Sequence, residues 1–248
     1  LCTDADRAIR GLRLLRQLLK PRRTVIAIED NKPRCIQLYR KLTKDEDGME
    51  VCALKSLYPQ GGEKVLIYHT TGKIMPEGKL PIDVGSVVMN VTSVATLAHY
   101  CTTGMPLVEK CITVDGSAIK EPKNVIAPIG TACKEVIDFA GGFGCEPKKL
   151  VMGGPMMGIC IPDVADPILK ANNAILAFEK ILDTKPSACI HCGRCLEACP
   201  LRLMPTEIAK AFRQKDSEAL GAHKVTLCMN CGCCTYACPA KRPVAETN

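Results

Sequence analysis

The strongest constraint on this chain is a cysteine pattern that occurs twice. The stretch CIHCGRCLEACP, residues 189–200, places four cysteines at intervals of three, three and four. The stretch CMNCGCCTYACP, residues 228–239, repeats this spacing 39 positions later, and a proline closes both copies. We call these the first and the second cysteine motif. Structural zinc usually takes two separated Cys-x-x-Cys pairs per ion, whereas this compact spacing is typical of cubane iron–sulfur clusters.

The repetition has a topological reason. Three cysteines of each copy surround one cluster, and the fourth, before the proline, ligates the cluster of the other copy. We therefore predict two [4Fe–4S] clusters. Their expected ligands are Cys189, Cys192, Cys195 and Cys238 for one cluster, and Cys228, Cys231, Cys234 and Cys199 for the other. Neighbouring clusters carry single electrons and perform no substrate chemistry, so the pattern predicts an electron relay. The extra Cys233 and His191 are expected to have no ligand role.

Composition narrows the function classes further. Seventeen cysteines would suggest disulfides in a small secreted protein, but eight form the motifs and most others stand singly in apolar segments. We therefore expect a reducing compartment, with most of these thiols buried as small core residues. The net charge of +7 is scattered and Trp is absent, which argues against nucleic-acid binding. The 25 uncharged residues between Asp83 and Glu109 are too polar for a membrane span.

The first part of the chain, residues 1–104, alternates between helix and strand patterns. Strands are expected at 24–28, 51–55 and 84–89, and helices at 4–20, 33–41, 63–72 and 93–104. This order predicts an α/β domain with a parallel sheet, whose ligands bind where the strands end. The loops placed there contain Glu29 and Asp30, then Gly61 and Gly62, then Asn90 to Ser93. They suit a nucleotide, with Thr92 or Ser93 capping a phosphate-binding helix, but also suit ordinary turns and caps.

The remaining segments have different patterns. Residues 105–159 contain short strand and helix signals that resemble a β-grasp module, and the methionines at 152, 156 and 157 are expected in its core and turns. Residues 160–185, which include the apolar run AILAF, are expected to form a linker. Residues 186–248 then form a helical ferredoxin-type domain with both cysteine motifs.

Several motifs together resemble a known family. IEDNKP, YPQGGEK, MNV before a small polar pair, PIGT, GGPMMG and both cysteine motifs are similar to the C subunit of the Rnf ion-translocating electron-transport complex. The family is also similar to the flavin-bearing subunit of respiratory complex I. The resemblance covers nearly the whole chain. It implies a flavin- and NADH-binding domain, a β-grasp domain of the SLBB type and a dicluster domain.

The resemblance also implies cofactors, partners and site residues. Electrons would pass between NAD(H) and ferredoxin through FMN and two [4Fe–4S] clusters, in a peripheral subunit at the cytoplasmic face of the cell membrane. The family's flavin and nicotinamide pocket corresponds here to Gly61, Gly62, Glu63 and Lys64. Its flavin-phosphate segment corresponds to Asn90, Val91 and Thr92, and Glu29 and Asp30 lie at the same crevice.

One departure and two alternatives follow. The family's glycine-rich flavin loop and acidic motif would precede residue 4, so we expect this chain to hold FMN weakly. A related cobalamin-reducing subunit shares the flavin, β-grasp and dicluster parts and is one alternative. The other is a non-catalytic ferredoxin-docking relay without a nucleotide site.

Overall fold

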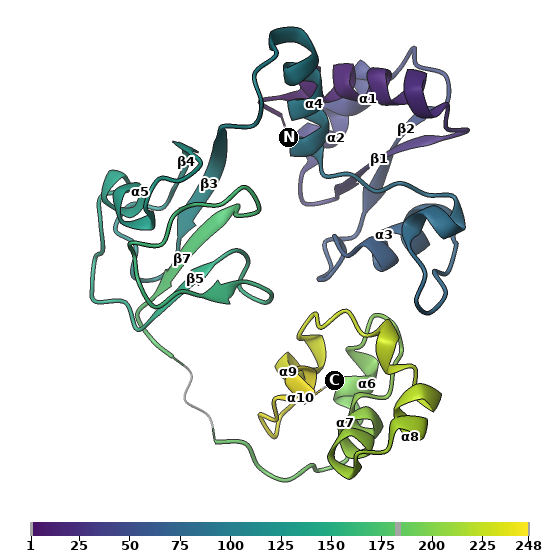
Figure 1. Ribbon diagram of the computed structural model, residues 1–248, viewed down its shortest axis with the longest axis vertical. Coiled ribbons are helices and arrows are strands. Elements are labelled where there is room, and N and C mark those ends of the chain that lie inside the picture. The colour runs from purple at the N-terminus through teal and green to yellow at the C-terminus, as the bar shows by residue number, and fades with distance from the viewer. Residues whose placement is uncertain (1, 182–184, 248) are drawn as a thin grey trace. The chain divides into compact units, whose positions relative to one another are not determined.

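The computed structural model describes residues 2–181 and 185–247 (Figure 1). Residues 182–184 of the expected linker and the two end residues lie outside this description. The described chain forms two compact units. One contains the residues up to 106 together with 193–229 and 247, and the other contains 107–192 together with 230–246. The expected cluster segment therefore contributes to both units.

The first unit begins with alternating helices and strands. In chain order these are α1 (Ala5–Leu19), β1 (Thr24–Glu29), α2 (Pro33–Leu42), β2 (Met49–Leu54), α3 (Glu63–Thr71), a 3-10 helix (Pro81–Val84) and α4 (Val91–Thr103). β1 and β2 pair in parallel, from Thr24 opposite Met49 to Glu29 opposite Leu54. This confirms the expected α/β class with a parallel sheet. The carboxyl ends of both strands lie at one edge, where the expected ligand loops begin.

Helices α1 and α4 pack closely beside the sheet (Figure 1). A Cβ atom on Gly11 of α1 would overlap the carbonyl oxygen of Val94 in α4, so glycine permits this approach. Beneath them lies an apolar core from α1, α2, α4 and both strands, with Tyr39 fully buried. This packing fixes the start of α4 relative to the ends of the strands.

One expected strand is wrong. Residues 84–89 are predicted from the sequence as the third strand of the sheet, but Val84 ends the 3-10 helix and Gly85 has a left-handed φ of 66°. Val87 and Met89 remain largely exposed. β-branched residues favour a strand only where a neighbouring strand completes the hydrogen-bond ladder. In the described part of the chain, β1 and β2 pair only with each other.

The second unit contains a five-stranded sheet in the order β4-β3-β7-β5-β6 (Figure 1). Its elements are β3 (Glu109–Asp115), β4 (Lys123–Pro128), α5 (Cys133–Phe139), β5 (Lys149–Met152), β6 (Ile159–Cys160) and β7 (Ala174–Phe178). The run AILAF, expected in a linker, is instead the central strand β7, parallel to β3 and antiparallel to β5. Its alternating burial explains this, because Ile175 and Ala177 are both fully buried.

The cysteines outside the two motifs differ from the expectation of buried thiols. Cys133 is buried, but Cys101, Cys111, Cys145 and Cys160 are exposed. On β3, side chains alternate between the faces, so buried Ile112 forces its neighbour Cys111 outward. Cys2 and Cys35 form a disulfide, which the expectation of a reducing compartment did not include.

The cluster segment is built from short helices. They are α6 (Arg194–Glu197), α7 (Pro205–Gln214), α8 (Ser217–Ala222), a 3-10 turn (Val225–Leu227), α9 (Cys233–Tyr236) and α10 (Val244–Thr247). Among the residues that the structure describes, no helix has the length and apolarity to cross a membrane.

Candidate electron-transfer site

The two cysteine motifs have the same backbone conformation. His191 and Asn230, which occupy equivalent positions, have left-handed φ values of 54° and 49°. The equivalent glycines, Gly193 and Gly232, have φ values of 77° and 80°, and each precedes a four-residue helix. The repeat in sequence is therefore also a repeat in structure, with the same turns around each set of cysteines.

The hydrogen bonds of the two motifs repeat as well. The N–H of Cys199 donates to the carbonyl oxygen of Leu196 at 3.2 Å, and Cys238 donates to Thr235 at 3.2 Å. After the last cysteine of each motif, Arg202 and Lys241 donate back to that cysteine's carbonyl oxygen at 3.1 Å. These bonds close the same turn around the fourth cysteine of each motif, which lies beyond the end of its short helix.

The chemistry of these residues fits iron–sulfur clusters. The N–H of Leu203 donates to Sγ of Cys199 across 3.4 Å, and N–H donors to sulfur stabilise the charge of a thiolate ligand. No three His, Cys, Asp or Glu side chains converge on one metal-ion position within the described residues. Each cysteine of a cubane binds a different iron atom, so its ligands do not meet at one point.

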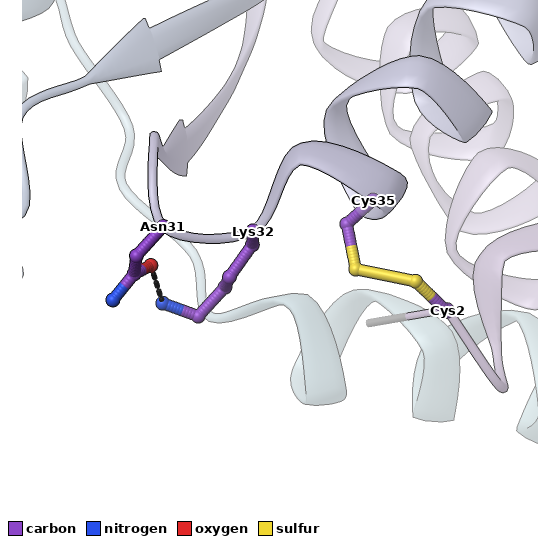
Figure 2. Close-up of a disulfide and its surroundings, with 4 residues drawn as sticks. All are labelled: Cys2, Asn31, Lys32 and Cys35. Carbon is purple, nitrogen blue, oxygen red and sulfur yellow. Dashed lines mark hydrogen bonds between the residues drawn. A yellow bond between two sulfur atoms is a disulfide. The ribbon is translucent and has the colours of Figure 1, made fainter.

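The residues expected at the end of β1 form hydrogen bonds and an ion pair with neighbouring residues. Oδ1 of Asp30 accepts a hydrogen bond from the N–H of Ser56 at 3.1 Å, which joins the loops after β1 and β2. Glu29 forms an ion pair with Lys32, and Lys32 also donates to Oδ1 of Asn31 at 2.8 Å (Figure 2). The positive charge of Lys32 therefore lies between the acidic and amide groups of this loop.

Residues 58–64, which we call the glycine loop, follow β2 and include the start of α3 at Glu63. Gly61 faces open space, with no atom within 4 Å of the position of a Cβ, so a ligand can approach its backbone. Gly62 differs from the expectation, because its open side is filled by the methyl group of Met229. Glu63 starts α3 and is exposed, whereas Nζ of Lys64 donates to the carbonyl oxygen of Leu227 at 2.8 Å.

Sequence reasoning missed a polar pair that holds this loop. Gln60 is one of the few buried polar residues, at 5% exposure, and its Oε1 lies 2.8 Å from Nδ1 of His69 in α3. A buried amide requires a hydrogen-bond partner, so this pair fixes the loop against its own helix. The position of Gln60 directly before two glycines was the available signal in the sequence.

The start of α4 is capped by Asn90. Its Oδ1 accepts a hydrogen bond from the N–H of Thr92 at 2.8 Å, so Thr92 and Ser93 are not the cap that the sequence suggested. Asn is a strong capping residue because its side chain reaches the unpaired N–H groups of the first turn. Val91 and Thr92 thus form the first turn, whose remaining N–H groups suit a phosphate.

Family comparisons agree with this architecture. The model of the Nuo51 FMN-binding domain matches residues 1–99, that of the SLBB domain matches 111–159, and that of the 4Fe-4S dicluster domain matches 180–241. The fold also resembles the crystal structure of an NAD+-reducing [NiFe]-hydrogenase in the H2-reduced state. The TM-score is 0.61 at 15% identity, over 98% of this chain and 50% of the other.

Curated relatives carry consistent names. The chain is 41% identical over 215 residues to the C subunit of the proton-translocating ferredoxin:NAD(+) oxidoreductase complex of Clostridium ljungdahlii, covering 86% of this chain and 47% of the relative. It is 40% identical over 212 residues to the Na(+)-translocating counterpart of Acetobacterium woodii, covering 84% and 47%. It is 36% identical over 224 residues to the C subunit of the ion-translocating oxidoreductase complex of Yersinia pseudotuberculosis, covering 89% and 32%. The chain thus spans half or less of these relatives.

Fold, motifs and comparisons define the class as a flavin and iron–sulfur protein with an FMN-binding domain, an SLBB domain and a 4Fe-4S dicluster domain, which confirms the expected FMN and cluster cofactors. Within that class, the chain belongs to the family of the C subunits of the Rnf ion-translocating ferredoxin:NAD oxidoreductase complexes. The resemblance noted in the sequence is therefore confirmed.

Proposed function

We propose that this chain is the part of an Rnf-type C subunit that transfers electrons between NAD(H) and ferredoxin. It would act at the periphery of the complex, on the cytoplasmic face of the cell membrane, bound to the other subunits. The names of the relatives support this choice over a cobalamin-reducing subunit. The observation that carries the proposal is the structural repeat of the two cysteine motifs, because such a repeat suits two interlocked clusters and no single ion.

The proposed ligands are those expected from the sequence. Cys189, Cys192, Cys195 and Cys238 hold one cluster, and Cys228, Cys231, Cys234 and Cys199 hold the other. Gly193 and Gly232, both with a left-handed φ, leave room for backbone N–H groups to approach the cluster sulfurs. The Leu203 N–H adds a donor to Cys199.

The proposed flavin and nicotinamide site lies at the ends of β1 and β2 and at the start of α4. Gly61 allows close approach of an isoalloxazine or nicotinamide ring, and Glu63 is exposed beside it. The first turn of α4, whose Thr92 N–H is capped by Asn90, would bind the phosphate through the N–H group of Val91 and the hydroxyl of Thr92. Glu29 and Asp30 supply acceptors for hydroxyl or ring N–H groups. Gly62 and Lys64 support the loop from its other side.

When bound, FMN exchanges electron pairs with a nicotinamide, and the clusters carry the electrons singly. The residues of this chain hold the flavin and nicotinamide site in place. The Asp30–Ser56 bond holds the two strand ends together, and the hydrogen bond between buried Gln60 and His69 holds the glycine loop against α3. The Lys32 ammonium, held between Glu29 and Asn31, keeps this edge from accumulating negative charge that would repel a phosphate-bearing ligand.

The test is anaerobic reconstitution with iron and sulfide, followed by titration with NADH while cluster reduction is monitored by electron paramagnetic resonance (EPR). The proposal predicts two reducible 4Fe-4S clusters per chain when FMN is supplied. Zinc in place of iron and acid-labile sulfide would refute it. If the clusters form and accept electrons from dithionite but never from NADH in the whole protein, the ferredoxin-docking relay is the correct function.

A further inference from the structure

The two cysteine motifs share a backbone but differ in their surroundings. Gly193 and Gly232 have nearly the same φ. A Cβ on Gly193 would meet no atom within 4 Å, whereas a Cβ on Gly232 would come within 3.1 Å of Cε of Met156. The GGPMMG turn (153–158) therefore packs on the second motif. Among the described residues, the first motif has no counterpart of this contact at its glycine.

A second loop reaches the same motif. Nζ of Lys64 donates to the carbonyl oxygen of Leu227, the residue immediately before Cys228. The methyl group of Met229, the residue immediately after it, fills the side of Gly62. Oγ1 of Thr226, the residue before Leu227, donates a hydrogen bond to the carboxylate of Glu77. These three contacts hold residues 226–229 against the glycine loop and against the segment that follows α3.

The two cysteine motifs also differ in the burial of their cysteines and in their charge. Cys231 and Cys234 of the second motif are buried, at 8% and 9% exposure. In the first motif, Cys192 is exposed and Cys195 is half-buried. The first motif also carries Arg194 and Glu197, whereas the second motif has no charged residue between its first cysteine and its proline.

We propose that the two clusters are not equivalent. The cluster of Cys228, Cys231, Cys234 and Cys199 lies beside the glycine loop, and Lys64 is the positioning residue that fixes it there. The inference rests on the proposed function, because it requires both the clusters and a flavin site at this loop. The cluster of the first motif is then the one whose ligand Cys192 is open to solvent.

Lys64 would also adjust the reduction potential of the neighbouring cluster. A reduced cluster gains a negative charge, which a half-buried ammonium nearby stabilises. Lys64→Met keeps the length of the side chain but removes the charge and the bond to Leu227. We expect the midpoint potential of the second-motif cluster to fall in an EPR-monitored redox titration, with no change for the first-motif cluster.

Two further sets of variants make the assignment specific. Cys192→Ser and Cys231→Ser identify which EPR signal belongs to the first and to the second motif. Arg194→Met, beside Cys195, is the reciprocal control and is expected to shift the first-motif signal alone. Gly62→Ala and Gly221→Ala form a second pair, because an added methyl overlaps Met229 in the first variant and meets open space in the second. Gly62→Ala should perturb the second-motif signal, and Gly221→Ala should leave both cluster signals unchanged.

The outcomes separate this inference from the proposed function. If iron and sulfide analysis finds no clusters in the unmodified protein, both are wrong. If both clusters form but Lys64→Met and Gly62→Ala shift the first-motif signal, or neither signal, the proposed function stands and the asymmetry is refuted. Iron content and circular dichroism of each variant show that a shift arises in a folded, loaded protein.

Discussion

The backbone N–H of Leu203 donates a hydrogen bond to Sγ of Cys199 across 3.4 Å. Cys199 is the cysteine that precedes the proline of the first motif, and it is the proposed fourth ligand of the other motif's cluster. A donor on this sulfur stabilises negative charge there, so it favours the thiolate and the reduced cluster. The bond thus sits at the point where the two proposed clusters exchange a ligand.

The proposed ligand exchange predicts which cluster is lost when Cys199 is replaced. Cys199→Ala removes the fourth ligand of the Cys228, Cys231 and Cys234 cluster, so iron and acid-labile sulfide should fall toward one cluster per chain. The EPR signal that remains should be that of the first motif, although the mutation lies in that motif. Cys233→Ala is the control, because Cys233 lies outside the ligand spacing and both clusters should remain. Loss of the first-motif signal in Cys199→Ala would contradict the exchanged arrangement.

The cap of α4 gives a stability prediction. Asn90→Ala removes the acceptor for the N–H of Thr92, and loss of such a cap costs about 1 kcal/mol of unfolding free energy. Urea unfolding followed by circular dichroism measures this change. Ser93→Ala in the same turn is the matched control and should unfold at the original urea concentration. An equal loss in both variants would show that Asn90 is not the cap.

Alanine substitution at two helix glycines, Gly11 and Gly221, should change the stability of the protein in opposite directions. In Gly11→Ala the new methyl overlaps the carbonyl oxygen of Val94, so α1 and α4 must separate, at a cost of about 1–3 kcal/mol. Gly221 in α8 faces open space, and alanine there should stabilise the helix by up to ~1 kcal/mol. Thermal unfolding midpoints of the two variants should therefore move in opposite directions. A stabilising Gly11→Ala would refute the close α1–α4 packing.

The sequence predicted those parts of the fold that depend on local signals. Periodic apolar residues and the stops at Lys20 and Gly72 located α1 and α3, and the β-branched run at 24–28 located β1. The errors arose where long-range pairing decides. In the described part of the chain, residues 84–89 have strand propensity but pair with no strand, and the run 174–178 has a linker pattern in the sequence although β3 and β5 flank it. No local pattern reveals a distant pairing partner.

The same limit applies to the site. The spacing of the cysteines predicted both motifs, and their backbones repeat as that spacing suggests. The sequence marks both glycines of the glycine loop as candidates, but it does not show that their surroundings differ. Gly61 is open, whereas Gly62 is glycine because Met229, 167 positions later, occupies the space of a side chain. Contacts of this kind depend on the folded chain.

Thiol reactivity should differ between two cysteines of the second unit, Cys133 and Cys111. Burial raises the pKa of the Cys133 thiol, with a further contribution from the charge of Asp166. A raised pKa lowers the thiolate fraction at pH 8, and the side chain is fully buried, so alkylation by iodoacetamide should be slow. Cys111 is exposed on β3 and should react much faster. Peptide mass spectrometry over time measures both rates, and equal rates would contradict the packing of α5.

The disulfide between Cys2 and Cys35 joins the segment before α1 to the first turns of α2 (Figure 2). A link across 33 residues restricts the unfolded chain and stabilises the folded one by about 3.5 kcal/mol in the chain-entropy description. Under non-reducing conditions, Cys35→Ser should therefore unfold at a clearly lower urea concentration. Cys52→Ser replaces a half-buried cysteine without a disulfide and should change the midpoint far less. Adding dithiothreitol should lower the midpoint of the Cys52→Ser variant to near that of Cys35→Ser, because only the former has the link to lose. Equal midpoints before reduction would show that the Cys2–Cys35 bond does not form in solution.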